Sequence, residues 1–247
     1  LPTLADFERT KLERQYIEDR IHFAIAGVAG SGKSSLINAF RGISKGAASA
    51  ADTGVVETTY NIGRYEDPNP DRSRFVWYDI PGAGTASISS PDYFNKQGLY
   101  IFDAIIVLFD SRFVDTDISI LKNCKKFNIP AFIVRSKSDV HMKAIADEKR
   151  EALEVDESED EEDVRSKERE VRMKRIDADA KGWYISLTRQ NVKENLKKAG
   201  LDEEQRIYLI SRRTLLRIVR GQQVAPMKLV DEYELIKDIL TTVKGRR

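Results

Sequence analysis

A nine-residue stretch near the N-terminus, GVAGSGKSS from Gly27 to Ser35, has the residue types and spacing of a phosphate-binding loop. Its glycines let the backbone curl closely, so that successive N–H groups point inward at phosphate oxygens. Lys33 is expected to bridge the outer phosphates, at the positive end of a helix dipole, and the Ser34 hydroxyl to bind Mg²⁺. The expected nucleotide-binding residues of this loop are Gly27, Gly30, Ser31, Gly32, Lys33, Ser34 and Ser35.

A second group of candidates follows the apolar run that ends in Asp79, where the sequence continues as Ile-Pro-Gly. An aspartate at the end of a strand beside the phosphate loop can hold Mg²⁺ through water, and Gly82 can offer its N–H to a γ-phosphate. The next residue is Ala83, whose side chain cannot orient an attacking water molecule. Any hydrolysis must therefore position its water by other means.

The segment between these two motifs, Asp52 to Gly63, is expected to change with the bound nucleotide. A threonine hydroxyl in such a loop normally reaches Mg²⁺ when the γ-phosphate is present. Thr53, Thr58 and Thr59 are the candidates, and position favours Thr59. Glu57 is the only carboxylate in the middle of the loop, where three phosphates would repel it unless it met the ribose, the water or a second molecule.

The sequence RSKSD, Arg135 to Asp139, again at the end of an apolar run, predicts recognition of guanine. A carboxylate at Asp139 can accept hydrogen bonds from N1 and the exocyclic N2 of guanine, whereas adenine lacks this pair of donors. Lys137 would lay its aliphatic stem along the base. Backbone N–H groups near Ser211, at the end of the last apolar run, could meet the guanine O6, although a serine that only caps a strand end fits the sequence nearly as well.

The composition limits the class of protein. The chain has 247 residues, of which 41% are hydrophobic and 33% charged, and a net charge of +1. This balance gives no reason to expect nucleic acid as a partner. A single cysteine, Cys124, fits a reducing compartment, so a cytoplasmic location is expected, and no apolar run is long enough to cross a bilayer.

Strand and helix patterns alternate along the chain, which predicts an α/β fold with a mostly parallel central sheet and helices on both faces. Short apolar runs predict buried strands over residues 22–28, 74–80, 104–110, 131–136 and 206–211, and an edge strand over 58–65. Helical spacing is found in KSSLINAFRG, TDISILKNCKKFN, RQNVKENLKKAG (ending at Gly200) and VDEYELIKDILTTVK.

Two segments flank or interrupt this alternation. Residues 1–20 predict an amphipathic N-terminal helix that precedes a nucleotide-binding domain over 21–247. Within that domain, residues 145–180 are dominated by charge and include the acidic run EVDESEDEED at 154–163. Either a solvated, partly disordered insertion flanked by helix or an acidic tether for a basic partner fits this segment.

Taken together, the motifs resemble the immunity-related GTPases, the interferon-inducible family. GVAGSGKSSLINAFRG, TGVVETT, YDIPGAG, SRFVDTDI, FIVRSKSD and IYLIS occur in family order over roughly residues 20–245. The resemblance implies a Ras-like P-loop GTPase domain enlarged by helical segments, GTP and GDP as substrate and product, and self-association through nucleotide faces to a dimer or higher oligomer. It also implies that Glu57 contacts the neighbouring nucleotide, and that members often associate peripherally with membranes.

The chain departs from the family pattern at several positions. Val28 and Ala29 stand where acidic and hydroxyl residues are common, Ser136 replaces the usual Thr or Asn, and the acidic run is unusual. The chain ends soon after its last predicted helix, so we expect a divergent member without the family's C-terminal helical domain. These departures weaken any expectation of work on membranes.

Three candidate functions can be compared with these sequence motifs. A GTPase activated by self-association, with Glu57, Gly82 and Lys33 as catalytic groups, fits most of the motifs. A GTP-binding switch or scaffold with little hydrolysis is favoured by Ala83 and Val28, because much of the rate of such enzymes comes from groups missing here. A P-loop ATPase or small-molecule kinase is disfavoured by Lys137 and Asp139, which indicate guanine.

Overall fold

A six-stranded sheet forms the centre of the computed structural model, which describes residues 1–52, 61–82, 92–154 and 165–244. The strand order is β2-β3-β1-β4-β5-β6; β2 runs antiparallel to β3 and all other neighbours are parallel. The strands are β1 (Ile21–Ala26), β2 (Gly63–Glu66), β3 (Phe75–Asp79), β4 (Ala104–Phe109), β5 (Ala131–Arg135) and β6 (Ile207–Leu209). The predicted α/β class with a mostly parallel sheet is confirmed. The edge strand β2 overlaps the range of 58–65 predicted for it only at residues 63–65, and residues 58–60 lie outside the described residues.

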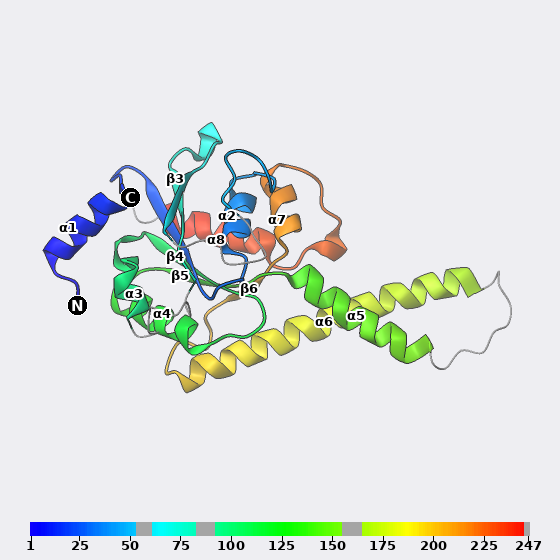
Figure 1. Ribbon diagram of the computed structural model, residues 1–247. Helices are drawn as coiled ribbons and strands as arrows, with labels where there is room; N and C mark the ends of the chain where they lie inside the picture. Colours follow the sequence, from blue (N-terminus) through cyan, green and yellow to red (C-terminus); the bar gives the residue numbers. More distant parts are fainter. Residues whose placement is uncertain (53–60, 83–91, 155–164, 245–247) are drawn as a thin grey trace.

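Eight helices and three short 3-10 turns surround this sheet among the described residues (Figure 1). The helices are α1 (Leu4–Glu13), α2 (Lys33–Phe40), α3 (Tyr93–Lys96), α4 (Asp115–Lys126), α5 (Ser138–Glu154), α6 (Arg165–Lys198), α7 (Arg212–Val219) and α8 (Glu232–Lys244). The 3-10 turns are η1 (Pro70–Arg72), η2 (Leu99–Ile101) and η3 (Pro226–Lys228). The sequence patterns did not single out α3, α5 or α7, and they predicted only the C-terminal part of α6, from residue 189 on.

Each face of the sheet has its own apolar core, because the strands are buried on both sides. On one face, residues of α2, α7 and α8 such as Leu36, Leu215 and Leu235 pack against alternate strand residues. On the other face, α3, α4 and the C-terminal half of α6 do the same, for example through Phe94 and Leu196. The expectation of helices on both faces is thereby confirmed.

Helices α5 and α6 form a long antiparallel hairpin that extends away from the sheet (Figure 1). The described parts of the charged segment predicted at 145–180 are helical and belong to this hairpin; the acidic run beyond Glu154 lies outside the described residues. A small apolar cluster of Ala146, Ile176 and Ala180 holds the two helices together. The charges therefore lie on two packed helices.

The N-terminal helix is shorter than the range of 1–20 predicted for it. Thr3 caps α1, which ends at Glu13, and turns connect it to β1. Phe7 packs against the ring of Tyr100 with ring centroids 4.7 Å apart, and Thr10 is hydrogen-bonded to the Tyr100 hydroxyl at 2.7 Å. The helix thus packs on the domain at η2. No helix in the described ranges is long and apolar enough to cross a membrane.

The C-terminal half of α6 should contribute to global stability although most of the helix is charged. Leu196 is fully buried against the sheet, whereas Leu187 on the same helix is 49% exposed. We expect Leu196→Ala to lower the free energy of unfolding by about 2–5 kcal/mol, because it opens a cavity in the core. Leu187→Ala is the matched control and should change it by less than about 1 kcal/mol. Equal urea midpoints for both variants would contradict this assignment of the buried face.

Candidate nucleotide-binding site

The glycine-rich loop leaves β1 and enters α2 through backbone conformations that require glycine. Gly27 has a φ of +142°, and a Cβ built on it would lie 2.1 Å from the carbonyl oxygen of Leu108 on β4. Gly30 and Gly32 have φ values of +78° and +96°, in the left-handed region. The expected strand–loop–helix context of this motif is therefore present.

Lys33, the first residue of α2, folds back over this loop. Its side chain is buried, and Nζ donates hydrogen bonds to the carbonyl oxygens of Val28 at 3.0 Å and Gly27 at 3.4 Å. The ammonium group is thus held above the loop, at the N-terminal end of α2. The helix dipole and this charge both favour an anion at the same point.

The two predicted metal ligands described by the structure meet directly. The Ser34 hydroxyl donates a hydrogen bond to Oδ2 of Asp79, which ends β3 next to β1. Oxygen donors of this kind suit Mg²⁺, which takes few protein ligands and completes its shell with phosphates and water. Among the described residues no cluster of three or more His, Cys, Asp or Glu could hold a metal ion without such help.

Gly82 lies against the phosphate loop. A Cβ at Gly82 would come within 2.6 Å of the Ala29 backbone nitrogen and 2.7 Å of its Cα, so only glycine permits this approach. The contact brings the segment after β3 next to the loop that follows β1, where the expected N–H donor to a γ-phosphate must lie. The remaining residues named from the sequence lie outside the described residues: Thr53, Glu57, Thr58, Thr59 and Ala83.

The loop after β5 is tied directly to the phosphate loop. The Ser136 hydroxyl donates to the Ser31 carbonyl oxygen at 2.7 Å, and Lys137 Nζ donates to the Gly30 carbonyl oxygen at 3.0 Å. The serine that replaces the usual Thr or Asn therefore makes one of the two ties between these loops. Asp139 lies half-buried in the first turn of α5.

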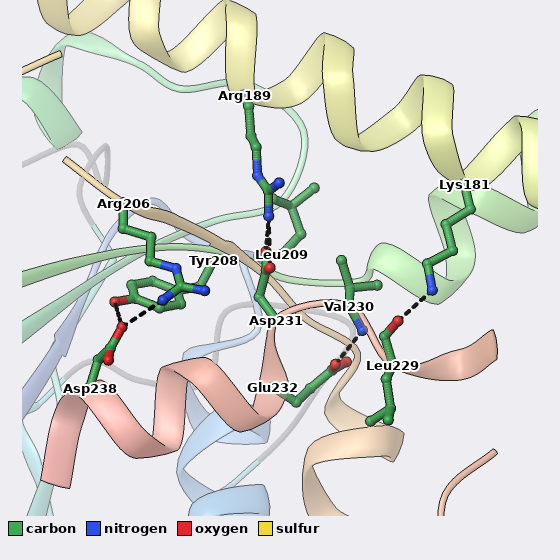
Figure 2. Close-up of polar contacts among 10 residues, drawn as sticks. All are labelled: Lys181, Arg189, Arg206, Tyr208, Leu209, Leu229, Val230, Asp231, Glu232 and Asp238. Carbon is green, nitrogen blue, oxygen red and sulfur yellow. Dashed lines mark hydrogen bonds and ion pairs between the residues drawn. The ribbon is translucent and has the colours of Figure 1, made fainter. Parts of the chain in front are cut away.

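The end of β6 is held by a pair of buried acids that sequence analysis did not single out. Glu232 accepts hydrogen bonds from the Ser211 N–H at 2.9 Å and the Val230 N–H at 2.8 Å, and burial raises the pKa of its carboxyl. Asp231 accepts from the Leu209 N–H and from Arg189 of α6 (Figure 2). The two acids stand at the start of the helical pattern VDEYELIKDILTTVK, and this position is the sequence signal that could have marked them as groups at a helix N-terminus.

This arrangement changes which backbone groups can face a base. The Ser211 N–H is bonded to Glu232, and the Ser211 hydroxyl is buried without a hydrogen-bond partner in the described part of the chain. The first N–H groups of α7, beginning with Arg212, have no partner within the helix. They are the backbone donors closest in sequence to the predicted position of the guanine O6.

A buried carboxyl at the start of α4 was also missed. Asp117 is fully buried, its Oδ2 accepts the Val114 N–H at 3.0 Å, and it interacts electrostatically with Lys33. Burial raises the pKa of Asp117 to about 7, which the Val114 hydrogen bond and the charge of Lys33 only partly oppose. An acid near the phosphate-binding lysine therefore titrates around neutral pH in the folded protein, where an exposed aspartate would be fully ionised.

A glycine loop between a strand and a helix, a Ser–Asp pair beside it and a Lys-x-Asp loop tied across to it define a P-loop nucleotide-binding domain of the GTPase class. The sequence model for the interferon-inducible GTPase (IIGP) family matches residues 11–175. The chain therefore belongs to this family, and the resemblance noted from its motifs is confirmed.

Individual relatives agree with this assignment. Interferon-inducible GTPase 1 of Mus musculus is 36% identical over 129 residues, which are 52% of this chain and 31% of the relative. Interferon-inducible GTPase 5 of Bos taurus is 30% identical over 196 residues, 78% of this chain and 35% of the relative. The chain thus spans about a third of the length of these relatives. Among solved structures, translation elongation factor SelB from Methanococcus maripaludis aligns with 92% of this chain and 34% of its own at a TM-score of 0.47 and 16% identity.

The raised pKa of Asp117 predicts a pH-dependent penalty on stability. The unfolded carboxyl ionises near pH 3.8 and the folded one near 7, so stability is lost progressively as pH rises through this window. Asp117→Asn keeps an acceptor for the Val114 N–H and should raise the free energy of unfolding at pH 8 by about 2–4 kcal/mol, with little change at pH 4. Thermal unfolding of the nucleotide-free protein across this range measures the effect.

The matched control for this experiment is Asp115→Asn, which changes an exposed acid in the same turn of α4. In this variant the free energy of unfolding should depend on pH as it does in the wild-type protein. A constant difference between wild type and Asp117→Asn from pH 4 to 8 would show that the Asp117 carboxyl does not titrate in this window.

Proposed function

We propose that this protein binds GTP with Mg²⁺ and hydrolyses it to GDP and phosphate. The observation that carries the proposal is the pair of hydrogen bonds by which the base loop is tied to the phosphate loop, from Ser136 to Ser31 and from Lys137 to Gly30. These bonds hold the loop that leads to Asp139 beside the phosphate loop, which supports a role for Asp139 in binding the guanine of the same nucleotide. Adenine lacks the two donors that such a carboxylate binds, which disfavours an enzyme specific for ATP.

In this proposal, each candidate site residue that the structure describes has its own role in binding or catalysis. The N–H groups of the glycine loop and Lys33 neutralise the phosphates, and Ser34 and Asp79 would hold Mg²⁺, which when bound stabilises negative charge on the phosphate oxygens. Gly82 lies close enough to the loop to offer its N–H to a γ-phosphate. On the base side, Asp139 accepts from guanine, and the stem of Lys137 covers one face of the ring.

The attacking water needs an orienting group that Ala83 does not supply. We propose that backbone groups of Gly82 and Ala83 hold this water and that two molecules meet at their nucleotide faces, where Glu57 contacts the neighbouring nucleotide. Support comes from the sequence around Glu57 and from the absence of a glutamine or an evident arginine finger, which predicts slow hydrolysis by a single molecule. If turnover stays negligible even on self-association, the protein is a GTP-dependent switch or scaffold.

We place the protein in the cytoplasm, where its single cysteine, Cys124, would stay reduced; its thiol is buried, and burial raises its pKa to about 12. Peripheral association with membranes is part of the proposal only through the resemblance to the family. No nucleic-acid partner is proposed, because the net charge of +1 provides no basic field.

Base selectivity tests the binding half of the proposal. Asp139→Asn replaces one acceptor oxygen by a donor, so we expect the affinity for GTP to fall about 10- to 100-fold while that for xanthosine triphosphate rises, as measured by competition against a fluorescent guanine nucleotide. Asp147→Asn, the same change further along α5, is the control and should leave both affinities unchanged. Unaltered selectivity in Asp139→Asn would refute the base assignment.

Self-association and hydrolysis are tested together by phosphate release at increasing protein concentration. Turnover per molecule should rise with concentration in the wild type and stay low in Glu57→Ala, whose GTP affinity at high dilution should be nearly unchanged. Lys33→Ala should release no phosphate at any concentration, which sets the background. Turnover that is flat with concentration would exclude activation by a partner molecule, and parallel losses of affinity and rate in Glu57→Ala would exclude a role for Glu57 between molecules.

A further inference from the structure

We propose that Asp110 is a positioning residue for guanine recognition, because its carboxylate holds the ammonium group of Lys137 and thereby places the aliphatic stem on which the base stacks. This inference rests on the proposed binding of guanine nucleotides and deepens it. Asp110 directly follows β4 and lies between the phosphate loop and the base loop.

Lys137 is fixed by two acceptors that come from different parts of the sheet edge. Its Nζ lies 2.5 Å from Oδ2 of Asp110 and 3.0 Å from the carbonyl oxygen of Gly30. One acceptor follows β4 and the other lies in the loop after β1. A lysine bonded to a single carbonyl can swing about that oxygen, whereas two acceptors in different directions define where its four-carbon stem runs.

The backbone at Lys137 shows that this loop is held in a costly conformation. Lys137 has a φ of +57°, which residues with a Cβ seldom adopt. Hydrogen bonds from the Ser136 N–H to the Phe109 carbonyl oxygen at 2.8 Å and from the Ser136 hydroxyl to Ser31 keep the preceding residue in place. Strain of this kind persists where the surrounding structure over-determines a site.

Asp110 is itself anchored, so that it can act as a fixed acceptor. The Arg135 Nε donates to the Asp110 carbonyl oxygen at 2.9 Å, and the Arg135 guanidinium is held by Thr188 and lies 4.8 Å from the centre of the Tyr184 ring, both on α6. The Asp110 side chain is only 22% exposed. Although burial opposes ionisation, the hydrogen bond and charge of Lys137 lower the pKa of Asp110, so it is charged at neutral pH.

Removing the Asp110 carboxylate should therefore weaken binding of the base and leave binding of the phosphates unchanged. Without it, Lys137 keeps only the Gly30 carbonyl oxygen and water, and its stem loses a defined position. Lys33 donates to the carbonyl oxygens of the phosphate loop and Ser34 donates to Asp79, and these hydrogen bonds do not pass through Asp110. The predicted signature is faster release of guanine nucleotides with undiminished affinity for a ligand that has phosphates and no base.

The experiment compares GDP with inorganic tripolyphosphate on the 247-residue chain with Mg²⁺. Asp110→Ala should weaken GDP binding about tenfold through faster dissociation and leave the affinity for tripolyphosphate unchanged. Asp110→Asn keeps a neutral acceptor and should give an intermediate loss. In a Lys137→Met background, Asp110→Ala should have no further effect on GDP, because the residue acts only through this lysine. Glu170→Ala is the control, because it breaks only an exposed ion pair with Lys174 on α6. It should leave the affinities for GDP and for tripolyphosphate unchanged.

Several outcomes would overturn the inference. Equal losses for GDP and tripolyphosphate in both Asp110 variants would mean that the residue only supports the fold, and additive losses in the Lys137→Met background would mean that it acts separately. Unchanged GDP binding in Asp110→Ala, with tight binding by the wild type, would refute this role and leave the proposed function standing. Failure of the wild type to bind any guanine nucleotide would refute both the role of Asp110 and the proposed function.

Discussion

The hydrogen bonds between the phosphate loop and the base loop are the constraint on which the site depends. The two loops follow β1 and β5, which are not neighbours in the sheet because β4 lies between them. Ser136 and Lys137 span this gap by bonding to the carbonyl oxygens of Ser31 and Gly30. The two loops are thereby held at a defined separation. Asp110, which follows the intervening strand β4, accepts a hydrogen bond from the same Lys137.

Helix α6 stabilises the base side of this arrangement from outside the sheet. Thr188 and Tyr184 hold Arg135 at the end of β5, Arg189 pairs with Asp231 beside β6, and Lys181 donates to the Leu229 carbonyl oxygen before α8 (Figure 2). The same helix forms one arm of the extended hairpin (Figure 1). Any movement of α6 would therefore act on three segments at the base side, and Ser136 and Lys137 connect one of them to the phosphate loop.

The site combines several groups that are unfavourable for folding alone. Lys137 has a left-handed backbone, and Asp117 and Glu232 are buried carboxyls whose pKa values burial raises. The two carboxyls are tolerated because neighbouring N–H groups donate hydrogen bonds to them. The Val114 N–H donates to Asp117, and the Ser211 and Val230 N–H groups donate to Glu232. Such costs concentrate where a binding site must be pre-formed.

The sequence by itself determined what depends on local residue types. Gly27 to Ser35 predicts its loop because only glycine fits those conformations, and apolar runs predict buried strands because a parallel sheet covered on both faces excludes water from every position. Asp79 and Asp139 are predicted as site residues because their motifs follow such strands. Only the tertiary structure revealed the contacts of Asp110, Asp117 and Glu232, since an isolated acid in a sequence predicts no more than a solvated charge. Their partners lie on other elements or in the interior, and folding alone brings a carboxylate to Lys137 or to the Ser211 N–H.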